Sequence, residues 1–170
     1  IKPVNWSALA RAADTLVVLM GFSNLTEITR KLICSGKGKR TPAAVISFAT
    51  TPRQRTITAP LEKIARVSEE AGLQPPAILV VGRVVKYKEN LDWFESRPLF
   101  GRRILVTRPR HQAGALAARL EGLGADVMVL PVVEIKPLSD YSRADGVIRR
   151  MIRAVKKAAC DWIVFTSANG

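Results

Sequence analysis

Cysteine and histidine are scarce in this chain of 170 residues, which holds only Cys34, Cys160 and His111 of these two types. Two distant cysteines are too few for a disulfide framework or a zinc site, so we expect each to pack as a small apolar side chain in a reducing, cytoplasmic environment. A Ser-His-Asp triad or a histidine-rich metal site would depend on His111 alone, which we expect to be a solvated residue at the start of a helix. We therefore predict no metal site.

Long apolar runs and a leader segment are also missing. One of the longest apolar runs, Leu16–Phe22, is far shorter than the roughly 20 residues that a membrane-spanning helix needs, so we expect no membrane partner. No basic stretch followed by an apolar one opens the chain, and nothing indicates secretion. The chain begins with Ile1 and stops at Gly170, directly after a strand-like run, so we expect it to be an internal piece of a longer protein.

Acidic residues are few relative to basic ones, and the formal net charge is +13. The excess is spread over both halves of the chain, which favours polyanionic partners: nucleic acid, an acidic membrane surface, or a small molecule with many carboxylates. Aromatic residues make up only 6% of the sequence, which disfavours a platform that stacks single-stranded bases. The charge alone leaves these partners open.

Apolar periodicity predicts alternating strands and helices in both halves, and hence an α/β fold. We expect strands over 15–20, 43–49, 55–58, 77–85, 104–107, 127–133 and 161–166, and helices over 6–12, from Asn24 to before Gly36, from Pro60 to before Gly72, from 110 to before Gly124 and over 143–159. Asn24 and Glu27 have the spacing of a capping box. The last helix is basic on one face and is expected to turn Ile148, Met151, Ile152 and Val155 inward. A polar passage with proline and glycine around residues 95–103 is typical of a linker.

Small or unusual residues follow three of the predicted strands, at Leu19–Gly21, Phe48–Thr51 and Phe165–Gly170. In open α/β sheets, ligands collect at the carboxyl ends of strands, where small residues let a ligand approach the backbone. The basic loop Gly36–Arg40 lacks the spacing and the strand-to-helix setting of a phosphate-binding loop, so we expect it to be an ordinary loop.

The first half resembles the C-terminal lobe of the uroporphyrinogen-III C-methyltransferases, within the tetrapyrrole methylase family. Five motifs carry this resemblance: Asp14–Gly21, Thr41–Val45, Thr50–Arg55, Pro75–Val85 and Leu91–Phe94. The resemblance implies that Met20 and Ala49 contact S-adenosyl-L-methionine, the methyl donor. The family often has glycine in place of Ala49, which implies a slightly tighter pocket here.

The second half resembles the start of uroporphyrinogen-III synthase, a flavodoxin-like α/β enzyme. The resemblance rests on Gly101–Arg108, on Leu123–Ala125 with Leu130-Pro131, and on Asp161–Asn169. Thr166, Ser167 and Asn169 follow a predicted strand and can offer neutral donors to substrate carboxylates, while Arg108 can add a charge-assisted bond. The alternative interpretation is that Thr166 and Ser167 only cap the next helix.

Together the two resemblances predict a methylase lobe over residues 1–96, a linker over 97–101 and a partial synthase domain over 102–170. They imply that the parent protein cyclises hydroxymethylbilane to uroporphyrinogen III and methylates that product to precorrin-2, in sirohaem or cobalamin synthesis. Both substrates bear many carboxylates, which explains the net charge without nucleic acid. We expect a homodimer through the methylase part, catalytic acid and base residues outside this sequence, and neither reaction completed by this stretch unaided. The competing hypothesis is a basic α/β module that binds nucleic acid and has no enzymatic activity.

Overall fold

The computed structural model of the chain describes residues 4–136 and 139–156. The chain divides into two units, Ile1–Val133 and Glu134–Gly170. The boundary predicted between a methylase lobe and a synthase domain, near residues 97–101, falls inside the first unit and stays a prediction.

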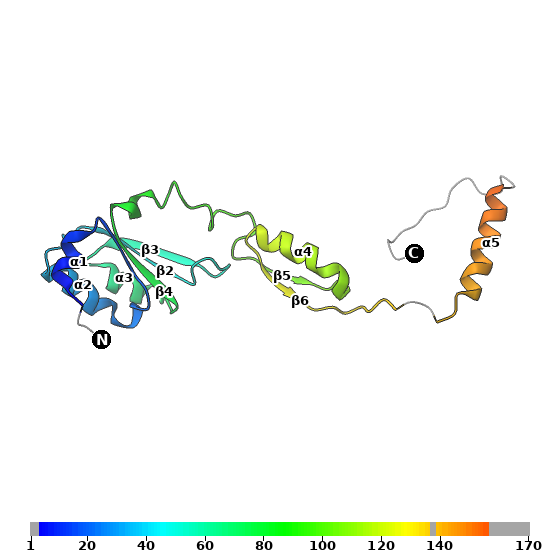
Figure 1. The fold of residues 1–170 in the computed structure, drawn as a ribbon, viewed down its shortest axis with the longest axis horizontal. Coiled ribbons are helices and arrows are strands. Elements are labelled where there is room, and N and C mark those ends of the chain that lie inside the picture. The colour runs from blue at the N-terminus through cyan, green and yellow to red at the C-terminus, as the bar shows by residue number, and fades with distance from the viewer. Residues whose placement is uncertain (1–3, 137–138, 157–170) are drawn as a thin grey trace. The chain divides into compact units, whose positions relative to one another are not determined.

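A four-stranded antiparallel sheet forms the first part of the Ile1–Val133 unit (Figure 1). Its strands are β1 (Thr15–Val18), β2 (Pro42–Ser47), β3 (Arg55–Pro60) and β4 (Ala77–Gly82), in the order β1-β4-β2-β3. Helices α1 (Trp6–Ala12), α2 (Leu25–Cys34) and α3 (Ile64–Glu70), with the 3-10 turns η1 (Phe22–Asn24) and η2 (Arg83–Tyr87), complete this part. The alternation of helices and strands predicted from the sequence is therefore present, and the mixed α/β class is confirmed.

The core of this part lies between one face of the sheet and helices α2 and α3. Val45 of β2 and Val81 of β4 alternate with outward residues along their strands, and both are at most 1% exposed. They share one apolar cluster with Leu32 of α2 and Ile64 of α3, which are also almost fully buried. Full burial of such side chains contributes about 1.5–3 kcal/mol each, so this cluster fixes the sheet and its helices as one body.

Several element boundaries differ from the prediction. Asn24 does precede α2, but its side chain makes no capping bond, and Glu27 instead pairs with Lys31 at 2.6 Å. Pro60 ends β3 rather than opening a helix, since it lies opposite Pro42 in the pairing with β2 and an edge strand tolerates proline. Strand β4 stops at Gly82, where the backbone turns to φ 146°, instead of running on to Val85.

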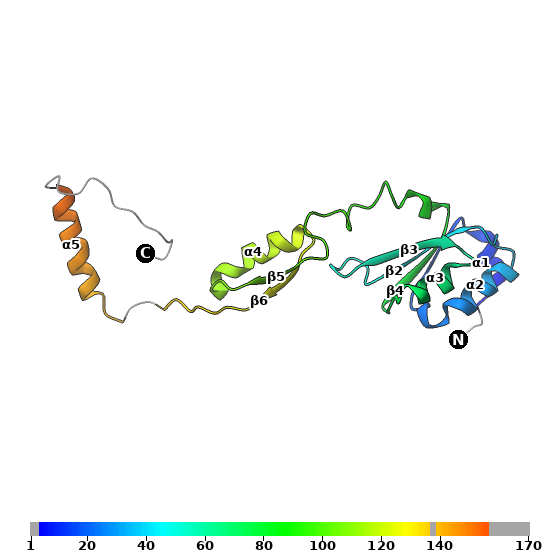
Figure 2. The same ribbon diagram turned by 180° about the vertical axis from the view of Figure 1, so that it is seen from behind.

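A parallel βαβ unit follows, built from β5 (Arg103–Val106), α4 (Arg110–Gly122) and β6 (Asp126–Val129). Figure 2 shows α4 beside the two strands from the opposite side to Figure 1. The helix turns Ala113 and Ala117 inward, at 2% and 8% exposure, and Leu116 and Leu120 on the same face are half-buried. Strand β6 ends earlier than predicted, because Pro131 cannot donate to a ladder. Parallel strands joined by a helix are the repeating unit of flavodoxin-like folds.

The Glu134–Gly170 unit contains helix α5 (Ser142–Lys156) in its described part. Asp140 accepts bonds from the Ser142 backbone N–H at 2.9 Å and hydroxyl at 2.8 Å, and these two bonds lower the pKa of the Asp140 carboxyl. The prediction that this helix turns four apolar side chains inward is wrong, because all four are exposed: Ile148, Met151, Ile152 and Val155. Residues 134–136 and 139–156 hold no strand or second helix to cover them, and the predicted strand 161–166 lies outside the described residues.

Candidate functional site

Two of the strand ends singled out in the sequence meet at one edge of the antiparallel sheet. Strands β1 and β2 run in the same direction, because each is antiparallel to β4, which lies between them. In the register Val18 lies opposite Leu79, and Ser47 lies opposite Ala77. Met20 and Ala49, each two residues beyond its strand, therefore emerge at the same edge, on either side of the chain entering β4.

The backbone at this edge adopts an uncommon conformation. Met20, Phe48 and Thr50 have φ angles of 54°, 49° and 63°, and they are the non-glycine residues with positive φ among those described. The left-handed conformation costs about 1–2 kcal/mol for a residue with a side chain. Such costs persist where the surroundings hold them, and they cluster at ligand sites. The clustering of all three residues at one sheet edge marks it as the candidate site.

Met20 is available to a ligand at this edge. Its side chain is 95% exposed, although methionine is usually buried. It borders a cavity of about 420 Å³ whose other lining residues are Phe22, Ser23, Pro75, Pro76 and Ala77. The Phe48 backbone N–H donates to the Pro76 carbonyl at 2.9 Å, which ties the loop carrying Ala49 to this wall. Polar and apolar atoms contribute about equally to the cavity surface, and the Met20 thioether adds a polarizable group that can lie against a flat ligand ring.

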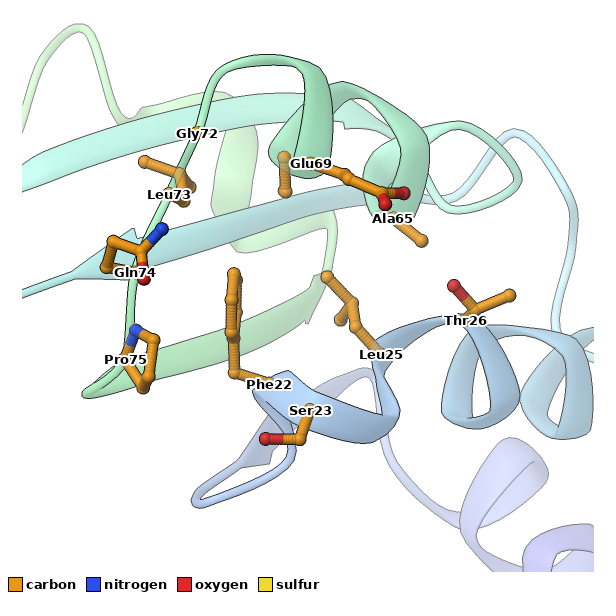
Figure 3. Close-up of a pocket in the computed structure, with 11 residues that line it drawn as sticks. Phe22, Ser23, Leu25, Thr26, Ala65, Glu69, Gly72, Leu73, Gln74 and Pro75 are labelled. Atoms are coloured by element: carbon orange, nitrogen blue, oxygen red, sulfur yellow. The ribbon is translucent and has the colours of Figure 1, made fainter.

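A second cavity, also of about 420 Å³, shares Phe22, Ser23 and Pro75 with the first (Figure 3). The Phe22 ring stands between Leu25 and Gln74 in this view, and Phe22 lines both cavities. Ser68 of α3 borders the second cavity, but its hydroxyl is fully buried and has no hydrogen-bond partner among the described residues. A buried hydroxyl without a hydrogen-bond partner destabilises the folded state, so we expect the Ser68 hydroxyl to lower the free energy of unfolding.

A polar network that no sequence pattern predicted lies next to the candidate site. The Glu95 carboxylate accepts bonds from the Gln54 side-chain amide at 3.0 Å and from the Thr56 hydroxyl at 2.6 Å. Lys88 pairs with Glu95 at 3.3 Å and with Asp92 at 3.1 Å. Burial lowers the pKa of Lys88, but its bonds to Asp92 and Glu95 outweigh that effect, and the net pKa lies above its usual value. No sequence pattern indicated the contact, since Gln54 and Glu95 lie 41 positions apart.

The candidate substrate residues of the second half are only partly described. Arg108 is exposed and follows β5, at the carboxyl edge of the parallel pair β5-β6. The Leu130 backbone N–H donates to the Val106 carbonyl at 2.9 Å, which holds the ends of the two strands together beside Arg108. Thr166, Ser167 and Asn169 lie outside the described residues, so their placement relative to Arg108 stays a prediction.

The histidine and the two cysteines were predicted to have no role in a site. His111 is exposed near the start of α4, as predicted. Cys34 is exposed at the end of α2, which corrects the expectation of a packed thiol, because the buried stripe of this helix consists of Leu25, Ile28, Thr29 and Leu32. Cys160 lies outside the described residues. The described part of the chain holds no group of three or more metal-ligating side chains, and none of its helices is long and apolar enough to cross a membrane.

Comparison with known proteins gives two family matches in one chain. Residues 1–65 match the family described as Tetrapyrrole (Corrin/Porphyrin) Methylases, and residues 114–170 match the family described as Uroporphyrinogen-III synthase HemD. The porphyrin biosynthesis protein HemD of Ruminiclostridium josui is 35% identical over 156 residues, which cover 92% of this chain and 30% of that protein. A protein of Bacillus subtilis (strain 168) named uroporphyrinogen-III C-methyltransferase is 34% identical over 162 residues, which cover 94% of this chain and 33% of that protein.

Solved structures are also similar to part of this chain. One is the uroporphyrin-III C-methyl transferase of Thermus thermophilus complexed with S-adenyl homocysteine, with 33% identity and a TM-score of 0.44 over 50% of this chain and 37% of that one. The present chain spans about a third of the length of the two curated relatives above.

The α/β chain therefore holds a segment similar to the tetrapyrrole methylases, followed by a segment similar to uroporphyrinogen-III synthase. The resemblance stated from the sequence is thereby confirmed.

Proposed function

We propose that this chain is part of a bifunctional protein of sirohaem or cobalamin synthesis. Its synthase part would close hydroxymethylbilane to uroporphyrinogen III, and its methylase part would transfer methyl groups from S-adenosyl-L-methionine to that product, giving precorrin-2. The observation that carries the proposal is the presence of both family matches, in this order, on one chain of 170 residues. Two reactions that share an intermediate gain from a common chain, since the intermediate stays at a raised concentration near the second site.

The sheet edge supports the assignment of the methyl donor to the first half. S-adenosyl-L-methionine carries a flat adenine and a charged methionine chain joined at a sulfonium, and the exposed Met20 thioether beside the 420 Å³ cavity offers a polarizable surface to the adenine. Ala49 is half-buried in the loop across the β4 entry, and its small side chain leaves the backbone approachable. The residues present fit the group. When bound, the methyl donor supplies an electrophilic methyl group; Met20 and Ala49 would hold and orient it from this lobe.

The excess of basic residues supports polycarboxylate substrates. A net charge of +13 raises the local concentration of hydroxymethylbilane and uroporphyrinogen III, both rich in carboxylates. In the synthase part, we assign substrate carboxylates to Arg108, together with Thr166, Ser167 and Asn169. Arg108 is exposed at the strand edge, where a charge-assisted bond to a carboxylate can form.

We also propose a homodimer through the methylase part and a cytoplasmic location. Strand β1 is an edge strand of the sheet. Its Val17 is 59% exposed, and Leu19, which follows the strand, is 64% exposed. An exposed apolar edge strand is prone to pair with another chain, and a second copy is the simplest cover. The exposed Cys34 thiol fits a reducing compartment.

The test uses the natural protein that carries this chain. Uroporphyrinogen III and radiolabelled S-adenosyl-L-methionine should give a dimethylated tetrapyrrole, and hydroxymethylbilane should be cyclised by the same preparation. The Ala49→Trp variant, folded by circular dichroism, should lose methyl transfer and keep the cyclisation. A preparation that yields neither product but binds duplex DNA with a steep salt dependence would instead establish the nucleic-acid alternative.

A further inference from the structure

The segment that leads from η2 toward the βαβ unit is docked on strand β3 through one glutamate. Glu95 is only 17% exposed in its side chain. One of its oxygens accepts bonds from Gln54 and Thr56, and the other pairs with Lys88 at 3.3 Å. The ammonium of Lys88 lies beside this carboxylate, and a carboxylate can only accept hydrogen bonds. Glu95 therefore requires a donor from each group that faces it.

This requirement determines how the Gln54 side chain is turned. Its NH2 group donates to Glu95, so its carbonyl oxygen points the other way and accepts from the Thr50 backbone N–H at 2.7 Å. A reversed amide would bring its carbonyl oxygen against the Glu95 carboxylate and its NH2 group against the Thr50 N–H, and both contacts would be repulsive. The carboxylate thus presents the Gln54 oxygen to the loop.

The bond to Thr50 falls where the loop most needs support. Thr50 has a φ of 63°, a conformation that is costly for a β-branched residue. The same loop, Phe48–Thr51, carries Ala49 at the candidate site, and it is closed by the Thr51 backbone N–H donating to the Phe48 carbonyl at 3.1 Å. A short bond from Gln54 to the strained residue holds the backbone of Ala49 in place.

We propose that Gln54 is a positioning residue for the Phe48–Thr51 loop, and that Glu95 controls it from the connecting segment. Docking of this segment on β3 then sets the affinity of the methylase site for its methyl donor. The segment that leaves the methylase lobe toward the synthase part thereby influences how tightly the methylase site binds its methyl donor. The inference rests on the function proposed above, because it takes the loop with Ala49 as part of the donor site.

The natural protein that carries this chain is titrated calorimetrically with S-adenosylhomocysteine, the product of the donor. Gln54→Leu and Glu95→Ala should each weaken binding about tenfold, as expected for one lost hydrogen bond that orients a site. The double variant should bind S-adenosylhomocysteine only slightly less tightly than either single variant, because both changes break the same series of hydrogen bonds. Glu95→Gln should restore only part of the affinity, since its carbonyl can still accept from the Gln54 NH2 group while its own NH2 group then faces the Lys88 ammonium.

One control variant and one further variant keep the result specific. Glu89→Ala removes an exposed carboxylate of the same segment that makes no hydrogen bond with the described residues, and it should bind as the unaltered protein does. Thr56→Val removes the bond that joins Glu95 to β3 and leaves Gln54 in place, so it should weaken binding in the same direction as Glu95→Ala, but less. Hydrogen exchange at the Thr50 amide should be faster in Gln54→Leu and Glu95→Ala, with unchanged circular dichroism.

Kinetics separate positioning from a general loss of structure. In Gln54→Leu the KM for S-adenosyl-L-methionine should rise about tenfold while kcat falls less than threefold. Equal affinity in Gln54→Leu, Glu95→Ala and the unaltered protein would overturn this inference and leave the proposed function standing. An unaltered protein that does not bind S-adenosylhomocysteine would overturn the proposed function, and this inference with it.

Discussion

Gly82 is the position where a single methyl group should do the most damage to the methylase lobe. It ends β4 opposite Thr15, with φ 146° and ψ 174°, a region of backbone space that only glycine occupies readily. A Cβ atom placed there would lie 2.4 Å from the Asp14 carbonyl oxygen and 3.1 Å from the Thr15 Cα. Both neighbours are backbone, so they can yield only if strand β1 shifts.

The expected cost of Gly82→Ala follows from these two effects. The backbone conformation costs about 1–3 kcal/mol, and displacing the start of β1 adds a comparable amount, for a total of about 2–6 kcal/mol. A small domain has about 5–15 kcal/mol of stability in all, so the variant should be close to unfolding at ordinary temperature. The free energy of unfolding is measured by urea titration of the chain, followed by far-ultraviolet circular dichroism.

Gly72→Ala is the matched control for this experiment. Gly72 ends α3 with φ 64°, as the sequence predicted for a helix stop, but an added Cβ would meet nothing within 4 Å. The backbone term alone should cost about 1–2 kcal/mol. Equal losses in the two variants, or a loss below about 1 kcal/mol in Gly82→Ala, would show that the contact with Asp14 and Thr15 does not matter.

Further predictions concern the site and single side chains. Ala49→Trp should abolish calorimetric binding of S-adenosylhomocysteine by filling the space beside the loop; undiminished affinity in a folded variant would remove Ala49 from the site. Ser68→Ala should raise the free energy of unfolding by about 1 kcal/mol, because it removes a buried hydroxyl without a partner, and a loss of stability would mean that the hydroxyl is satisfied. The hydrogen bond and the charge of Lys31 hold the pKa of Glu27 below its usual 4.5, so this pair adds stability above pH 4.5 that is lost as the pH falls through the lowered pKa; carboxyl NMR titration should show the shift, and Lys31→Met should abolish it. In the synthase part, Ser167→Ala should raise the KM for hydroxymethylbilane with unchanged thermal stability, whereas a loss of about 1 kcal/mol with intact kinetics would make Ser167 a helix cap.

Local patterns in the sequence were sufficient for much of the first unit. Apolar runs located all four strands of the antiparallel sheet, and the glycines at 36 and 72 stop their helices with positive φ, as predicted. These features depend on residues within a few positions of each other, which periodicity and capping rules can read. The same rules failed where a neighbour in space determines the structure. Pro60 was predicted to start a helix, yet it ends a strand and pairs across the sheet with Pro42.

The α/β class, the two family resemblances and the candidates Met20 and Ala49 all followed from patterns in the sequence. The strand order did not: β4 lies between β1 and β2, and this arrangement brings both candidates to one edge of the sheet. The same holds for the contact of Glu95 with Gln54, and through it with the loop at Thr50. Strand order and such long-range bonds depend on the path of the whole chain and on the shared core. A pattern that compares residues only with their near neighbours carries no record of either.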